Sequence, residues 1–86
     1  MLADGAGNFT VDISKYKIIM LVSHNASNGN QVGTGLYLKD LIKSGSALYS
    51  PVAGTTNFCN CGFNTLTSIT MEANMTGIIP KLYGIK

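Results

Sequence analysis

Short apolar segments recur along the whole chain, and glycine, asparagine or serine follows most of them within a few residues. In several segments apolar and polar residues alternate, which is the pattern of a strand with one buried and one exposed face. About seven segments carry a strand pattern, at residues 9–13, 17–24, 32–38, 47–52, 58–63, 66–73 and 78–85. Many short strands separated by turn residues are typical of sandwiches and jelly rolls. The chain is therefore predicted to be all-β, a small antiparallel β-sandwich of the jelly-roll-like kind.

The segment KIIMLVSH at residues 17–24 contains five consecutive apolar residues. Such a run predicts a central strand covered on both faces, or a short buried helix. Its β-branched residues and the turn signals on either side favour the strand. The dipeptide Asn28-Gly29 that follows is a hairpin-turn signal. Gly33 and Gly35 lie inside the next strand, where glycine predicts a bulge or the close approach of another backbone.

One helical element is expected, of at most a short turn near residues 39–44. Leu41 and Ile42 have helical spacing with Leu38, and Gly45 stands just past the end of the pattern.

We expect residues 1–8 to be a linker and residues 9–86 to form a single sandwich domain. The opening residues have neither the positive nor the apolar region of a signal peptide. No apolar run approaches the roughly 20 residues that a membrane-spanning helix needs. The last eight residues have the pattern of a strand that runs into the C-terminus.

A domain of 86 residues buries only about 60% of the surface of its unfolded chain, so its stability alone is marginal. Small domains gain the missing stability from disulfides, a metal or a partner chain. The chain has two cysteines and one histidine. Association with other chains is therefore the expected supplement.

Charged residues are sparse: six lysines, no arginine, three aspartates and one glutamate. The net charge of +2 is small and scattered, and no arginine is present to grip phosphate or guanine with two hydrogen bonds. This argues against nucleic acid as a partner. The surface is expected to consist of asparagine, serine, threonine and glycine, a neutral polar composition common in extracellular adhesive and viral β-proteins.

Cys59 and Cys61 stand two residues apart on an expected strand, so their side chains share one face. A metal site formed by both cysteines and His24 is conceivable, although the spacing is not that of standard zinc motifs. A disulfide between same-face neighbours of one strand is geometrically awkward. The alternative is that both thiols are small buried apolar groups on the inner face, and we adopt it. No metal or cofactor is predicted.

Catalytic groups are not evident. His24 ends a strand without a recognisable nucleophile and acid beside it, so a surface position is the simpler interpretation. Asp12, Asp40 and Glu72 lie in different segments, and nothing in the sequence indicates that two of them converge as a hydrolytic pair. We therefore predict a protein that is not an enzyme, with no catalytic residues.

The polar loop at residues 25–31 and the tyrosines are the best candidates for a binding surface. Loops on a rigid scaffold carry recognition residues, and tyrosine stacks on sugars and is frequent in interfaces. For each tyrosine, packing on a strand with the hydroxyl at the rim is the structural alternative. The candidate binding residues are Asn25, Asn28, Asn30, Tyr37 and Tyr49.

Three short motifs occur in a familiar order. The strand ISKYKIIMLVS covers residues 13–23, the segment LYLKDLIKSG covers residues 36–45, and the chain ends in LYGIK at residues 82–86. In this order they resemble the small C-terminal β-domain of bacteriophage tail-fibre, minor-tail and related virion surface proteins. The middle segment departs from the pattern because it lacks the proline of that group.

The resemblance implies a non-enzymatic module on the virion surface, on a tail fibre or the capsid exterior. It implies a homotrimer at the tip of a fibre or spike that binds a host cell-surface glycan or protein, with other virion proteins as partners. A decoration or assembly module that contacts only capsid or tail proteins is the alternative. A third hypothesis, from another class, is a small metal-dependent or hydrolytic enzyme that uses His24, Cys59 and Cys61.

Overall fold

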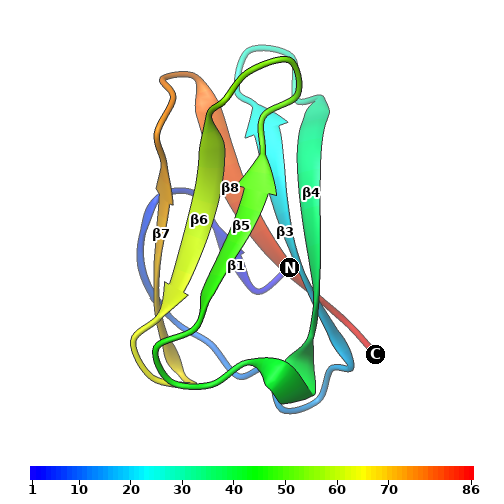
Figure 1. Cartoon of the computed structure of the whole chain (residues 1–86), viewed down its shortest axis with the longest axis vertical. Coiled ribbons are helices and arrows are strands. Elements are labelled where there is room, and N and C mark those ends of the chain that lie inside the picture. The colour runs from blue at the N-terminus through cyan, green and yellow to red at the C-terminus, as the bar shows by residue number, and fades with distance from the viewer.

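Eight strands form two antiparallel sheets in the structure, a computed structural model that describes residues 1–86 (Figure 1). One sheet has the order β1-β8-β3-β4 and the other β2-β7-β6-β5. The prediction of an all-β sandwich is therefore confirmed. The strands are β1 (Ala3–Asp4), β2 (Gly7–Thr10), β3 (Ile18–Asn25), β4 (Gln31–Leu38), β5 (Ala47–Pro51), β6 (Phe58–Phe63), β7 (Ser68–Ala73) and β8 (Ile78–Ile85).

Alternating residues of both sheets point inward and form the core. In β6 the inward residues Cys59, Cys61 and Phe63 are almost completely buried, whereas Phe58 has the opposite parity and is exposed. In β7, Ile69 and Met71 are buried against them. Every second residue in these strands is therefore buried, as the alternation in the sequence predicts.

Strand β3 is central in its sheet, because it pairs with β8 on one side and β4 on the other. Its inward residues Ile19, Leu21 and Ser23 are fully buried. On the outer face Val22 is also buried, but Ile18 and Met20 are only partly covered. The continuous apolar run therefore forms the predicted strand, while the predicted cover on its second face is incomplete within this chain.

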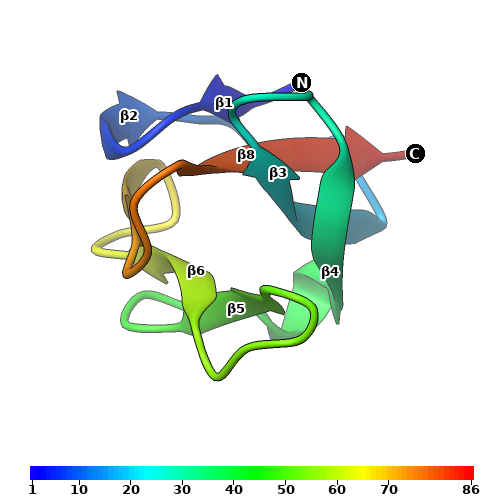
Figure 2. The same cartoon turned by 90° about the horizontal axis from the view of Figure 1, so that it is seen from above.

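Strands β4 and β5 belong to different sheets but lie side by side along one edge of the sandwich (Figure 2). Gly33 and Gly35 face inward, and a Cβ atom at either position would overlap a carbonyl oxygen of β5. The predicted close approach of another backbone is confirmed. The ladder between β3 and β4 also shifts register between Ser23 and His24.

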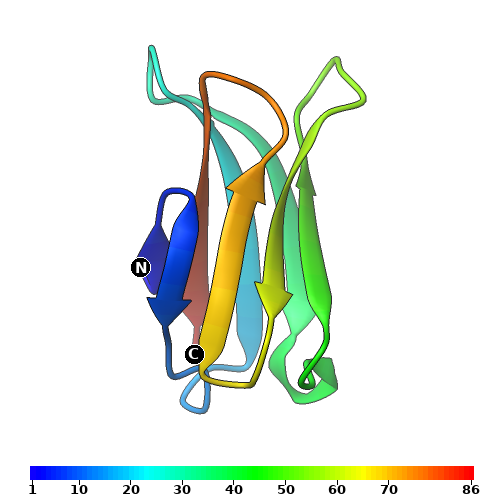
Figure 3. The ribbon, with the colours of Figure 1, turned by 90° about the vertical axis from the view of Figure 1, so that its left-hand side faces the viewer.

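The N-terminal residues correct the predicted linker over residues 1–8. Strand β1 pairs with β8, and β2 begins at Gly7 and pairs with β7, so the first ten residues cross from one sheet to the other (Figure 3). Ala3 is buried in the core cluster. Two residues of β1 give too short a pattern for the period of alternation to identify a strand.

Two other predicted elements differ in extent. The expected helical turn is a 3-10 turn, η1 (Lys39–Leu41). The strand predicted at residues 9–13 ends at Thr10, yet Val11 and Ile13 are buried in the core, which explains why the alternation continues past the strand. No helix in the structure has the length and apolar character to cross a membrane.

Candidate functional site

Three polar loops lie at one end of the sandwich, here called the loop end (Figures 1 and 3). They are residues 26–30, 52–57 and 74–77. The Ala26 amide donates to the Gly77 carbonyl over 2.8 Å, and the Ala53 amide donates to the Val32 carbonyl over 2.8 Å. None of the three loops contains a charged residue. The loop end is therefore a neutral surface of amide and hydroxyl groups, held by backbone hydrogen bonds between segments.

The predicted asparagines shape the first of these loops. The Asn25 side-chain oxygen accepts hydrogen bonds from the Ser27 amide at 2.9 Å and the Ser27 hydroxyl at 2.8 Å. The Asn28 side-chain oxygen accepts from the Asn30 amide at 2.9 Å. Such Asx turns fix a loop without secondary structure. Asn28 and Asn30 are exposed and Asn25 is half-buried, so the exposed amide groups face solvent from an ordered loop.

Two exposed aromatic rings lie on the outer face of the β2-β7-β6-β5 sheet. The ring centroids of Tyr49 and Phe58 are 5.5 Å apart with the planes at 69°, an edge-to-face pair. Tyr49 is 49% exposed. The Phe58 amide donates to the Asn74 side-chain oxygen over 2.8 Å, which ties the pair to the third loop of the loop end. Tyr49 is among the predicted binding residues, whereas Phe58 is not.

Tyr37, also a predicted binding residue, has an internal role for its hydroxyl. It points inward from β4, and its hydroxyl accepts from the Tyr49 amide at 2.8 Å and donates to the Tyr49 carbonyl at 2.9 Å. The hydroxyl thus takes the place of a neighbouring strand's backbone beside β5, and its only proton is used in this contact. Tyr37 thus packs on its strand, as the structural alternative supposes, but its hydroxyl binds the backbone of β5 and does not lie free at the rim.

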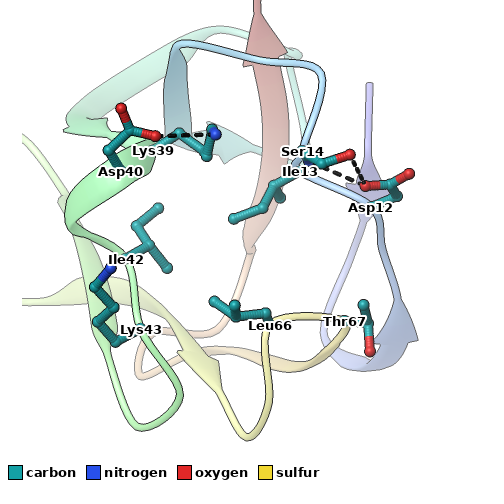
Figure 4. A pocket seen from close by; sticks show the side chains of 9 residues that line it. All are labelled: Asp12, Ile13, Ser14, Lys39, Asp40, Ile42, Lys43, Leu66 and Thr67. Atoms are coloured by element: carbon teal, nitrogen blue, oxygen red, sulfur yellow. Dashed lines mark hydrogen bonds and ion pairs between the residues drawn. The ribbon is translucent and has the colours of Figure 1, made fainter.

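The opposite end carries most of the charge. Six of the ten charged side chains lie in the segments before β3 and after β4, namely Asp12, Lys15, Lys17, Lys39, Asp40 and Lys43. This charged end also holds an open hollow of about 380 Å³ (Figure 4). Ile13, Ile42 and Leu66 point into it, while Asp12 and Lys39 lie at its rim.

Two carboxylates line this hollow, and both are held in the ionised form. Hydrogen bonds from the Ser14 hydroxyl and amide lower the pKa of Asp12. The Lys39 ammonium, 2.9 Å from the Asp40 carboxylate, lowers the pKa of Asp40. A hydrolytic pair needs one carboxyl group with a raised pKa to act as the acid. The fold brings two carboxylates to one hollow, but the pKa of each is lowered, so neither has the raised pKa that a general acid needs.

The residues of the third hypothesis do not meet. Cys59 and Cys61 point into the core, where burial raises the pKa of both thiols, that of Cys61 to about 12. His24 lies on the outer face of the other sheet, with its Nδ1 atom 3.2 Å from the Gly29 carbonyl oxygen. No three potential metal-ligating His, Cys, Asp or Glu side chains lie together. The predicted role of the thiols as buried apolar groups agrees with this placement.

The outer faces of the two sheets differ in chemistry. Pairing in register places apolar side chains from β3, β4 and β8 on one outer face, which we call the apolar face: Ile18, Met20, Leu36, Leu38, Tyr83 and Ile85. The other outer face carries Asn60, Ser68, Thr70 and Glu72, and the Thr70 hydroxyl donates to the Asn8 side chain over 2.7 Å. The apolar face is thus suited to a protein surface, whereas the second outer face is polar apart from the Tyr49–Phe58 pair beside the loop end.

Comparison of the chain with protein families, with curated proteins and with solved structures finds no match.

Some residues of these surfaces had no signal in the sequence. Asn74 lies 16 residues from Phe58 in the chain, and only the pairing of β6 with β7 brings its side chain to the Phe58 amide. The sequence indicates the apolar face only in part, because the uninterrupted apolar run in β3 implies apolar residues on both faces of that strand. Its extension across β4 and β8 depends on the register of three strands, which the sequence does not provide.

Proposed function

We propose that this protein is a non-enzymatic module of the phage virion surface that attaches to the host cell through its loop end. The observation that carries the proposal is an ordered surface that combines uncharged asparagine-rich loops with the exposed Tyr49–Phe58 pair. Aromatic rings supply a rigid apolar contact and neighbouring amides supply hydrogen bonds. A host cell-surface glycan or protein with few charges is the partner that such a surface suits.

The proposal places the module at the tip of a tail fibre or spike, as a homotrimer. The resemblance of the three sequence motifs supports this location, and the apolar face supports contact with neighbouring chains. With the loop end directed outward, the apolar face would meet other subunits and the polar face would meet water.

A decoration or assembly module is the second candidate, and the apolar face favours it. That face suits a permanent contact with another virion protein as well as a contact between copies. In this case the loop end would have no receptor, and the module would bind purified virions or tail proteins but not bacterial cells.

The test uses fluorescently labelled protein and a panel of bacterial strains, including strains with altered surface glycans. We expect labelling of some strains by the wild type and its loss in the double variant Tyr49→Ser, Phe58→Ser. The matched control is Leu66→Ser, an exposed apolar residue at the charged end. If no susceptible strain is labelled while virion proteins bind the module, the decoration function replaces the adhesion function.

A further inference from the structure

An exposed ridge of three leucines overlaps the apolar face and extends it towards the charged end. Leu36 and Leu38 on β4 and Leu41 on η1 are 62%, 60% and 72% exposed. The end of β4 and η1, which carry these residues, lie where the chain enters the charged end (Figure 1). Three large aliphatic side chains at this exposure, in one short segment, form a contiguous patch that is uncommon on the surface of a monomer.

Hollows flank the ridge on two sides. One has a volume of about 440 Å³ and is lined by eight residues, seven of them apolar, between β4, η1 and β5. The other, also about 440 Å³, lies between the ridge and Tyr16. Leu38 and Leu41 line both hollows. The chain therefore presents an apolar projection and an apolar recess next to each other.

Few charges oppose burial of this surface. Asp40 beside the ridge is neutralised by Lys39 at 2.9 Å, and Asp4 at the far edge of the sheet lies 3.7 Å from Lys81. Lys17 lies at the border of the second hollow. Interfaces have a centre depleted of charge and a polar rim, and the apolar face with its ridge has this arrangement.

We propose that a second copy of this chain covers the apolar face, with the leucine ridge of one copy seated in the β4–β5 hollow of the next. A surface that holds both a projection and a matching recess is complementary to itself, which is the condition for contacts between identical chains. The inference deepens the homotrimeric arrangement of the proposed function and rests on it. It assigns the residues that make the contact.

The apolar area exposed on this surface is close to the area that a contact between two copies would need. At roughly 120 Å² of apolar surface for a fully exposed aliphatic side chain, the ridge and the apolar face together expose roughly 350 Å² of apolar surface. Apolar atoms make up about 60% of an interface, and a stable interface takes at least about 600 Å² from each partner. The patch is thus of the size that one contact between copies requires.

The experiment measures molar mass by sedimentation velocity over a wide concentration range, for the full chain and two variants. Leu41→Asp places a charge on the ridge, and Leu66→Asp places the same charge on a leucine that is 47% exposed outside it. The wild type and Leu66→Asp are expected to associate with the same affinity. Leu41→Asp is expected to weaken association at least tenfold, and its circular dichroism should match that of the wild type because the position is exposed.

Two results would overturn the inference: a wild type that stays monomeric at the highest concentration, or a Leu41→Asp variant that associates as the wild type does. Binding to cells, measured in parallel, separates this failure from that of the proposed function. A monomeric wild type that labels cells refutes the contact and keeps adhesion. An associating wild type that labels no strain, but loses association on Leu41→Asp, keeps the contact and refutes adhesion.

Discussion

Glycine has a steric role at two neighbouring positions in this chain. Gly33 and Gly35 face the core from β4, and the space that side chains would occupy is filled by the backbone of β5. Both have ordinary strand torsions, so the requirement is space and not conformation. The contact lets β4 and β5 close one side of the sandwich at a distance that no other residue type permits.

We expect Gly35→Ala to lower the free energy of unfolding by about 3 kcal/mol or more, because the new methyl group overlaps the Tyr49 carbonyl oxygen and forces the strands apart. Urea denaturation measures the change. The control is Gly62→Ala, also inside a strand but with no atom near the added methyl group; it should be neutral or slightly stabilising. Equal effects of both variants would contradict the steric explanation.

The buried thiols should be nearly inert in the folded protein. Burial raises the pKa of Cys61 to about 12 and also raises that of Cys59, so at pH 8 the reactive thiolate is scarce and inaccessible. We expect Ellman's reagent to modify both cysteines at least about a hundredfold more slowly in the native protein than in denaturant. Comparable rates in the two conditions would show that the core opens readily or that the thiols are exposed.

At the scale of strands, the two edges of the sandwich are closed by different devices. The chain itself crosses between the sheets from β1 to β2 at one edge. At the other edge, the two hydrogen bonds of the Tyr37 hydroxyl join β4 to β5. Next to them, the Ser23 hydroxyl of β3 donates to the Ser50 hydroxyl of β5 over 2.9 Å. Side chains here satisfy backbone groups of an edge strand that would otherwise lack partners.

Tyr37→Phe removes both hydrogen bonds and leaves the Tyr49 amide and carbonyl groups without this partner. We expect a loss of about 1–3 kcal/mol in the free energy of unfolding, measured by urea denaturation, with faster hydrogen exchange of the Tyr49 amide. Tyr83→Phe, on the apolar face and away from this edge, should change neither quantity. An unchanged Tyr49 exchange rate in Tyr37→Phe would mean that water replaces the hydroxyl without cost.

The elements differ in how well the sequence predicts them. Strands such as β6 and β7 were predicted because one face is buried, which imposes a period of two on Cys59, Cys61 and Phe63. Strand β1 was missed because Ala3 and Asp4 are too few to show a period. Of the binding residues, Tyr49 lies beside the loop end, whereas the internal bonds of Tyr37 depend on the packing of β4 against β5, a contact between sheets that local pattern cannot specify.

At the scale of the molecule, charge and polarity are separated in space. The loop end carries no charged residue, the charged end carries most of them, and the two outer sheet faces are polar and apolar. Each surface therefore suits a different partner: uncharged polar groups at the loop end and the adjacent Tyr49–Phe58 pair, a protein at the apolar face, and water over the rest of the polar face. The proposed location at a fibre tip would use these three environments at once, because neighbouring chains would hold the module while one end faced a receptor.

This separation predicts how adhesion responds to salt. If the loop end binds the host surface, attachment rests on aromatic and amide contacts, which ions screen little, so raising ionic strength from about 0.05 to 0.5 M should change the apparent affinity for cells less than about twofold. If the charged end binds anionic cell-wall polymers through its lysines, the same change should weaken attachment many-fold. The double variant Lys15→Glu, Lys43→Glu distinguishes the two directly: it should leave attachment intact in the first case and abolish it in the second. A steep salt dependence together with loss of binding in this variant would move the receptor site from the loop end to the charged end, while the assignment of the apolar face to contact between copies would be unaffected.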